Sequence, residues 1–348
     1  MRLRKTLALL TSAALLVPMA ACGSNASDAS NTGSSSSPEK ISFMLDWTAN
    51  TNHVGLYVAQ KLGYYKDAGV DVSILPTSQA GAETAVETNV ANVGFTTLSN
   101  VAAFDEQGSH LKFVFDLTQK QVARWCALAS RTDITTPKDF DGKTFVTFGS
   151  AEQTAVLKQM ITTAGGTGTF DTATVGTSTF QTLTSGKGDF GGFYETWEGV
   201  ESRLNGPKLT CFVASDWGVP GNPDQLGFAV NSTWASSHTA ALQKFITATK
   251  RGYAYALAHP QKAADILVEQ AKDANLDPKL TRASMATIVN GKYWGSTSNL
   301  GVTNTSSAQK YIDFLWKKGV YKADNGKNPS SAPQATKLAT NHYVSATQ

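Results

Sequence analysis

The chain has 348 residues and a formal net charge of +3 at pH 7. Arg2, Arg4 and Lys5 account for this excess, because residues 1–21 contain no acidic side chain and the remainder is formally neutral. A neutral body gives no sign of the basic surface that nucleic-acid binding needs, so we expect no nucleic-acid partner.

The first 22 residues have the three parts of a secretory signal. Basic residues precede an apolar run, and Ala20 and Ala21 precede Cys22. We expect residues 1–21 to be a signal peptide and Cys22 to be lipidated, which would anchor the protein outside the cytoplasm at the cell membrane. Simple cleavage near Ala21 is the alternative. Residues 22–39 are rich in Ser, Gly and Asn, which predicts a flexible tether.

Strands and helices alternate along the body that follows. Its length of about 310 residues suits two domains, and the alternation predicts an α/β fold with parallel sheets covered by helices. We expect strands at residues 40–47, 71–76, 92–98, 112–119, 124–130, 208–215 and 226–232, and at the ends of segments 136–150 and 179–194. We expect helices at residues 52–61, 81–90, 101–108, 151–165, 195–204 and over most of the chain beyond 232.

Polar and aromatic side chains gather where the first predicted strand ends. Asp46 and Trp47 close this strand, and Asn50 and His53 follow in the loop and the next helix. Tyr57 lies one helical turn after His53, on the same face. A carboxylate, an indole, an amide and an imidazole at one strand end are typical of a binding site in an α/β protein.

A weak internal repeat favours two lobes. Residues 92–99 and 189–196 are both junctions in which a helix leads through polar residues into a strand that contains glycine. Each lobe would then offer one strand end to a shared cleft, where open α/β sheets bind ligands. Such a protein can close on its ligand.

Two cysteines lie in the body, Cys126 and Cys211, which are 85 residues apart. In an oxidising compartment they could form a disulfide, and two buried thiols are the alternative. Neither has a Cys or His neighbour at metal-ligand spacing, so we expect no metal site and no cofactor.

One family carries the same motifs in the same order. The pattern Asp-Trp-x-x-Asn-x-x-His-x-Gly-x-Tyr-x-Ala at residues 46–59 precedes TPKDFDGKTFVTFGS and GDFGGFYETWEG. The chain resembles the thiamine-pyrimidine-precursor binding proteins of bacterial ABC importers, which share a fold with fungal pyrimidine-precursor synthases. The resemblance covers most of residues 41–320.

The resemblance implies a two-lobed type II periplasmic-binding fold with a cleft between the lobes. Lobe 1 would contain residues 41–128 and 227–348, and lobe 2 would contain residues 129–226. The protein would act as a monomer that binds a small heteroaromatic molecule and delivers it to an ABC permease.

An aminopyrimidine needs aromatic faces for its ring and polar groups for its edge. We expect Trp47 to stack on one face of the ring, and Tyr194 or Trp197 from the opposite lobe to stack on the other. Trp125 lacks a charged neighbour at a strand end, so we assign it to packing.

The edge of the ring would meet Asp46 and Glu195 as acceptors of the exocyclic amine, and Asn50 and His53 as donors. Each role has a structural alternative. His53 could cap the helix or pair with Asp46. Glu195 could be a solvated first-turn residue that the helix dipole favours.

Two further positions have both a ligand role and a structural one. Ser150 opens a helix whose free backbone N–H groups would face the cleft; it also forms a capping box with Gln153. Tyr57 lies on the His53 face of its helix and could belong to the core instead.

A few single residues bear on the identity of the ligand and on whether the protein is an enzyme. Gly191 and Gly192 would enlarge the far wall, so a larger flat ring such as a flavin is an alternative ligand. A sulfonate or nitrate is a second alternative, for which only Arg124 and Lys143 are near. We expect no enzyme, because the chain lacks the cysteine-rich run of the fungal synthases and has no lysine in residues 46–60.

Overall fold

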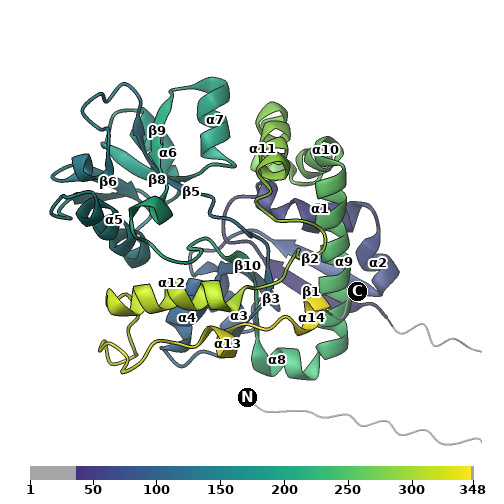
Figure 1. Ribbon diagram of the computed structural model, residues 1–348. Coiled ribbons are helices and arrows are strands. Elements are labelled where there is room, and N and C mark those ends of the chain that lie inside the picture. Colours follow the sequence, from purple (N-terminus) through teal and green to yellow (C-terminus); the bar gives the residue numbers. More distant parts are fainter. Residues whose placement is uncertain (1–36, 346–348) are drawn as a thin grey trace, which may run out of the picture. The chain divides into compact units, whose positions relative to one another are not determined.

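A computed structural model describes residues 37–345. The predicted signal peptide, the lipidation site at Cys22 and most of the tether lie outside the described residues. Residues 38–345 belong to one compact unit with two five-stranded sheets, and helices cover both (Figure 1). The fold is therefore α/β with two lobes.

Each lobe is built on one sheet. The first sheet contains β1 (Glu39–Met44), β2 (Val70–Leu75), β3 (Val93–Thr97), β4 (Leu111–Asp116) and β10 (Leu226–Asn231). Its order is β2-β1-β3-β10-β4. The second sheet contains β5 (Ala123–Leu128), β6 (Thr144–Thr147), β7 (Asp171–Thr174), β8 (Phe190–Tyr194) and β9 (Leu209–Phe212). Its order is β7-β6-β8-β5-β9.

The helices divide between the sheets. The second sheet carries α5 (Ala151–Thr163), α6 (Thr179–Thr184) and α7 (Glu198–Asn205). Around the first sheet lie α1 (Val54–Lys61), α2 (Tyr64–Ala68), α3 (Gly81–Glu87), α4 (Leu98–Asp105), α8 (Ser232–Ser237), α9 (Thr239–Ala258), α10 (Pro260–Gln270), α11 (Pro278–Gly291), α12 (Thr305–Lys317), α13 (Ala335–Leu338) and α14 (His342–Ser345). Short 3-10 helices are η1 (Thr51–His53), η2 (Pro137–Phe140), η3 (Gly176–Ser178), η4 (Ala214–Trp217) and η5 (Lys272–Ala274). The chain after β10 is mostly helical, as predicted.

The sheets are mixed, which differs from the parallel sheets that we predicted. In the first sheet β1 runs parallel to β2 and β3, but β10 runs antiparallel to β3 and β4. In the second sheet β6 runs parallel to β7 and β8, and β5 runs antiparallel to β8 and β9. The strands that break the parallel pattern are β10 and β5, and each is the first strand after the chain crosses from one sheet to the other. Neither crossing is a β–α–β unit, so it does not impose a parallel direction.

The crossing into lobe 2 comes earlier than we predicted. We placed residues 124–128 in lobe 1, but β5 pairs with both β8 and β9 and so belongs to the second sheet. The chain crosses over residues 117–122 instead, and returns over residues 213–225. The remaining lobe bounds stay predictions.

A close helix crossing fixes the position of the loop after β1. Helix α1 packs on α9 where Gly55 meets Gly252, and a Cβ atom at Gly252 would lie 2.0 Å from the backbone oxygen of Gly55. The hydroxyl of Tyr253 donates to the backbone oxygen of Asn52, at 2.6 Å. The glycines therefore allow the approach that holds η1, with His53, beside the end of β1.

Cys126 and Cys211 form a disulfide, with a sulfur–sulfur distance of 2.12 Å. The two residues lie directly opposite each other on the antiparallel strands β5 and β9. The bond therefore ties the edge strand β9 to its neighbour β5. In residues 37–345, no helix is long and apolar enough to cross a membrane.

Candidate functional site

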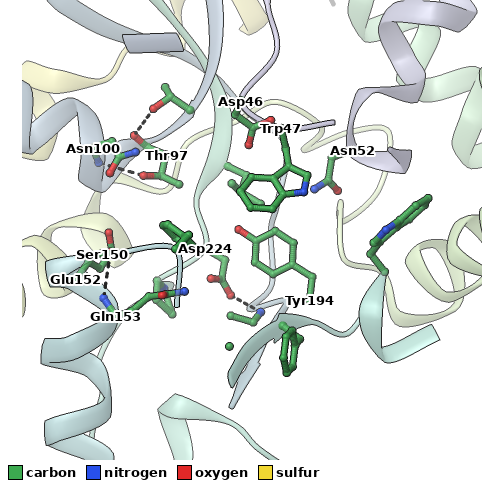
Figure 2. A pocket seen from close by; sticks show the side chains of 18 of the residues that line it. Asp46, Trp47, Asn52, Thr97, Asn100, Ser150, Glu152, Gln153, Tyr194 and Asp224 are labelled. Atoms are coloured by element: carbon green, nitrogen blue, oxygen red, sulfur yellow. Dashed lines mark hydrogen bonds between the residues drawn. The ribbon is translucent and has the colours of Figure 1, made fainter. Parts of the chain in front are cut away.

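A cavity of about 450 Å³ lies between the strand ends of the two sheets. The first sheet contributes the residues that follow β1 and β3, and the second contributes those that follow β6 and β8. Carboxyl ends of parallel strands open onto the same edge of a sheet, which is why the two edges meet here. The lining includes Asp46, Trp47, Asn50, Asn52, Glu83, Thr97, Asn100, Gln121, Trp125, Phe148, Ser150, Glu152, Gln153, Tyr194, Trp197, Glu198, Asp224 and Tyr311 (Figure 2).

His53 holds Asp46 in place from behind the cavity wall. The His53 side chain is 0% exposed. Its Nδ1 accepts from the backbone N–H of Asn50 at 3.2 Å, so the neutral ring carries its proton on Nε2 and donates to Asp46 Oδ1 at 2.9 Å. Asn50 caps η1 by accepting from the backbone N–H of Asn52. One carboxylate is thereby oriented, and the imidazole itself does not line the cavity.

Aromatic rings from both lobes project into the cavity. Figure 2 shows Trp47 from the first lobe and Tyr194 from the second directed into the same space. Trp47 also makes an edge contact with Phe148, with ring centroids 6.2 Å apart. Phe148 is 49% exposed, so part of its ring is free to meet a ligand. These rings are suited to a flat apolar ligand.

Trp125 and Gln121 line the same cavity, and each has buried polar atoms without partners in the described residues. Trp125 is 4% exposed, and its indole N–H has no hydrogen-bond partner in the described part of the chain. The buried amide nitrogen and oxygen of Gln121 also lack partners there. Leaving buried polar groups unpaired costs free energy, so such atoms at a cavity indicate a ligand that pairs with them.

Gly192 makes room for this arrangement. A Cβ atom at Gly192 would lie 3.0 Å from the Trp125 ring and 3.3 Å from the Gln153 amide. We expected the absence of a side chain at Gly192 to enlarge the cleft, but the Trp125 indole fills that space. Gly191 does not line the cavity, and its missing side chain accommodates the ring of Phe193.

Three helices begin at the cavity with a glutamate in the first turn. These are Glu83 of α3, Glu152 of α5 and Glu198 of α7. A helix N-terminus carries a partial positive charge, which favours a carboxylate at that position. Glu152 accepts from Ser99 at 2.9 Å and from Tyr311 at 2.6 Å, and so connects α5 of lobe 2 to α4 and α12 of lobe 1.

Asp224 is a fourth acid of the cavity lining; it is buried and lies in the return crossing. Its Oδ2 accepts from the backbone N–H groups of Val122 and Ala123, both at 2.8 Å. The carboxylate thus joins the two crossings between the sheets. Figure 2 shows it on the cavity wall near Tyr194.

Burial changes the acidity of these groups. It raises the pKa of Glu152 to about 7 and the pKa of both Glu198 and Asp224 to about 6, although hydrogen bonds to each carboxylate act in the opposite direction. Burial also holds the pKa of the Tyr194 hydroxyl well above its ordinary value, and the nearby carboxylates add to this effect. The carboxylates in question are those of Asp224, Asp46, Glu198 and Glu152.

Most of the residues that we predicted lie on the cavity wall. Six of them line it: Asp46, Trp47, Asn50, Ser150, Tyr194 and Trp197. Ser150 also caps α5, because its Oγ accepts from the backbone N–H of Gln153 at 3.2 Å, and this is the alternative that the sequence left open. Whether each of the six contacts a ligand stays a prediction.

Three predicted residues lie elsewhere. His53 is behind Asp46, and Tyr57 is in the hydrophobic core of the first lobe. Glu195 forms ion pairs outside the cavity with Arg203 and with Arg124, the latter at 3.8 Å. The acid that lines this wall is Glu198, one helical turn later, because the chain turns at residues 195–197 before α7 begins.

Sequence reasoning missed Glu198, Asp224, Gln121 and Trp125. Glu198 stands in the same GDFGGFYETWEG motif and is separated from Glu195 by two residues, so only the start of α7 distinguishes them. Trp125 lies in the middle of a strand, where packing is the usual role. Nothing near Asp224 or Gln121 in the sequence indicates a cavity, since both lie in the crossings.

Among the described residues, no group of three or more His, Cys, Asp or Glu side chains is arranged to hold a metal ion. The carboxylates of the cavity instead accept hydrogen bonds from neighbouring side chains and backbone N–H groups.

Known proteins resemble this chain in sequence and in fold. Over 240 residues it is 25% identical to the formylaminopyrimidine-binding protein of Halalkalibacterium halodurans, covering 68% of this chain and 72% of that protein. Over 73 residues it is 29% identical to the 4-amino-5-hydroxymethyl-2-methylpyrimidine phosphate synthase THI11 of Saccharomyces cerevisiae, covering 21% of this chain and 22% of the synthase.

Among solved structures, the alkanesulfonate-binding protein SsuA of Xanthomonas axonopodis pv. citri superposes with a TM-score of 0.66. The match covers 88% of this chain and 99% of that one at 10% identity, so it shows a shared periplasmic-binding fold and nothing of the ligand. The model of the family described as "NMT1/THI5 like" matches residues 50–263, which is more than half of the chain. The chain belongs to the NMT1/THI5-like family.

Proposed function

We propose that the chain is an extracytoplasmic substrate-binding protein of an ABC importer and that it binds a thiamine pyrimidine precursor. The observation that carries the proposal is the aromatic and acidic lining of a cavity between two lobes. The formylaminopyrimidine-binding protein, which matches over 68% of this chain, supports the same class of ligand. The predicted signal peptide and lipidation at Cys22 support a position at the outer face of the cell membrane.

The ligand ring would lie between Trp47 of lobe 1 and Tyr194 of lobe 2. Stacking on aromatic faces suits a flat heteroaromatic ring. Along its edge, Trp125 can donate to a ring nitrogen, because its indole N–H has no other partner in the described residues. Asp46 and Glu198 can accept from the exocyclic amine, in hydrogen bonds that the negative charge strengthens.

Lobe closure would couple binding to recognition by the permease. Glu152 already joins the lobes through Ser99 and Tyr311, and Ser284 of α11 donates to the backbone oxygen of Thr196 in lobe 2. A ligand that contacts both lobes adds to these interactions and favours the closed form. The permease would then bind the closed form of the monomer.

A sulfonate or nitrate ligand fits this cavity less well. Positively charged donors favour such anions, and the described lining contains no Lys, Arg or His side chain but five carboxylates. Arg124 donates to the backbone oxygens of Gln121 and Ala123, and Lys143 pairs with Asp133. The two candidate cations are thus engaged elsewhere.

A binding role is also favoured over catalysis. The relative that matches along most of this chain is named as a binding protein, whereas the synthase matches over 73 residues. Both ring nitrogens of His53 are engaged, and the ring is 0% exposed. A histidine in this position orients Asp46 and does not reach a bound molecule directly.

A fluorescence titration tests the proposal. Trp47, Trp125 and Trp197 line the cavity, so an occupied site should change the indole emission of the purified protein. We expect formylaminopyrimidine to give a saturable change with a dissociation constant of about micromolar or below, and taurine to give none. No response to formyl-, aminomethyl- or hydroxymethyl-pyrimidine at millimolar concentration would contradict the proposal.

A further inference from the structure

The cavity has a strongly negative wall. Five carboxylates line it, and no Lys, Arg or His side chain does so within the part of the chain that the structure describes. The carboxylates come from both lobes and from the return crossing: Asp46, Glu83, Glu152, Glu198 and Asp224.

Neutral groups, not cations, satisfy most of these carboxylates. Glu83 accepts from Thr96 at 2.5 Å and from Asn100 at 2.7 Å. Glu198 accepts from the backbone N–H of Tyr194 at 3.0 Å. Glu152 accepts from two hydroxyls and Asp224 from two backbone N–H groups, as described above. Hydrogen bonds of this kind hold the carboxylates in place without cancelling their charge.

Arg124 is the cation nearest to this wall, and it is shared. Its guanidinium lowers the pKa of Asp224 through their opposite charges, but it also lies 3.8 Å from Glu195 and donates to two backbone oxygens. Arg124 therefore offsets part of the negative charge of Asp224, which is one of the five carboxylates. The charge of the wall remains negative.

The helix N-termini do not reverse this sign. The ends of α3, α5 and α7 could attract an anion, but each has its own glutamate in the first turn. These glutamates offset the partial positive charge of the helix starts, which makes the sites less favourable for an anionic ligand. A cation in the cavity would meet carboxylates from several directions.

The Tyr194 hydroxyl identifies the place where these charges converge. Four of the five carboxylates act on it electrostatically, namely those of Asp224, Asp46, Glu198 and Glu152. The hydroxyl has no hydrogen-bond partner within residues 37–345, and Figure 2 shows it pointing into the cavity. A ligand cation here would also lie beside the Trp47 ring, which adds a cation–π attraction.

Trp125 lines the same wall, and its buried indole N–H has no partner in the described residues. Such a buried donor needs an acceptor. A pyrimidine ring nitrogen is such an acceptor, and a protonated amine on the same molecule supplies the charge that the carboxylates attract. One molecule can thus satisfy both features.

We propose that this cavity selects a pyrimidine that carries a protonated amine over pyrimidines of the same size that are neutral. The inference rests on the proposed function and narrows its ligand class. It distinguishes an aminomethyl substituent, which is an ammonium at neutral pH, from the hydroxymethyl and formylaminomethyl substituents.

Calorimetry with three matched ligands tests this inference. The ligands share the 4-amino-2-methylpyrimidine ring and carry an aminomethyl, a hydroxymethyl or a formylaminomethyl group at the next ring carbon. At pH 7 we expect the purified protein to bind the aminomethyl compound at least about tenfold more tightly than either neutral compound. Equal or tighter binding of a neutral compound overturns the inference and leaves the proposed function intact. Binding of none of the three overturns both.

A pair of variants locates the effect in the wall. Glu198→Gln removes one charge but keeps an oxygen that can accept from the backbone N–H of Tyr194. Its preference for the aminomethyl compound over the hydroxymethyl compound should fall by about fivefold or more, because the lost charge weakens the contact with the ammonium more than the contact with the ring amine that both compounds share. Glu201→Gln is the control, since Glu201 lies on the same helix and does not line the cavity. If Glu198→Gln kept the wild-type preference for the aminomethyl compound, the assignment of charge recognition to this wall would be contradicted.

Discussion

Trp47 lines the cavity from lobe 1 and contacts a side chain of lobe 2. It stands at the end of β1, faces the cavity with Tyr194 and touches Phe148 of the other lobe. Replacement by alanine should weaken ligand binding by more than about tenfold, because stacking on an aromatic ring contributes about 1–3 kcal/mol. Calorimetric titration of Trp47→Ala with the ligand of the wild type measures this. An unchanged dissociation constant would remove Trp47 from the site.

Two glutamates of the same motif should behave differently when each is changed to glutamine. Glu198 lines the cavity, whereas Glu195 pairs with Arg124 and Arg203 outside it. Glu198→Gln should weaken binding of an amine-bearing pyrimidine by about fivefold or more. Glu195→Gln should leave it within about twofold, since Glu195 does not line the cavity. Titrations of both variants with the same ligand give the comparison. If Glu195→Gln weakened binding more than Glu198→Gln, Glu195 would be the ligand contact that the sequence analysis predicted.

Some site residues could be predicted from the sequence and others, such as the choice between Glu195 and Glu198, could not. The Asp46–Trp47 end of β1 could be predicted, because consecutive polar and aromatic residues after an apolar strand have few other roles. Glu195 and Glu198 could not be told apart, since the choice depends on where the chain turns before α7. The sequence assigns Trp125 to core packing, because only the structure shows that its indole N–H lacks a hydrogen-bond partner in the described residues.

At the scale of elements, the cross-strand disulfide should stabilise the second lobe without taking part in binding. It closes a loop of 85 residues and ties edge strand β9 to β5, and neither cysteine lines the cavity. Replacing Cys126 and Cys211 together by alanine should lower the free energy of unfolding by about 2–5 kcal/mol. Urea unfolding measures the loss, and the dissociation constant is the control. An unchanged unfolding free energy would show that the bond contributes no stability in solution.

Most elements could be predicted from local patterns, but their pairing could not. Apolar runs between turn residues indicated β1, β3 and β10, and the amphipathic tail indicated helices. The antiparallel direction of β10 and the place of β5 in the second sheet depend on where the chain crosses between lobes. Those crossings have no regular periodicity, so the boundary at residue 128 was wrong by the length of a strand.

At the scale of the whole molecule, the buried acids should make the empty protein less stable as pH rises through 5 to 7.5. Burial raises the pKa of Glu152 to about 7 and that of Glu198 and Asp224 to about 6. In this window the folded state therefore holds more protons than the unfolded state, and ionisation of the buried groups costs stability. The free energy of unfolding should fall by a few kcal/mol, since each unit of pKa difference corresponds to about 1.4 kcal/mol.

Denaturant unfolding of the ligand-free protein at pH 5, 6, 7 and 7.5 measures this fall. A ligand with a protonated amine should restore more stability at pH 7 than at pH 5, because the raised pKa values leave Glu152, Glu198 and Asp224 largely protonated at pH 5 and more ionised at pH 7. A rise in stability across the same window would show that the cavity acids are not buried in the folded protein as described.

The most direct test of the proposed function is a thermal-shift comparison of the purified protein with hydroxymethyl-, aminomethyl- and formylaminomethyl-pyrimidine, thiamine, riboflavin, taurine and nitrate. A ligand present at about one hundred times its dissociation constant adds about 2.7 kcal/mol to the stability of the folded state, which raises the melting midpoint visibly. We expect pyrimidine precursors to raise the midpoint and taurine and nitrate to leave it unchanged. A rise with taurine or nitrate and none with any pyrimidine would contradict the account, because the fold would then serve an anion in a cavity whose described lining holds no cation.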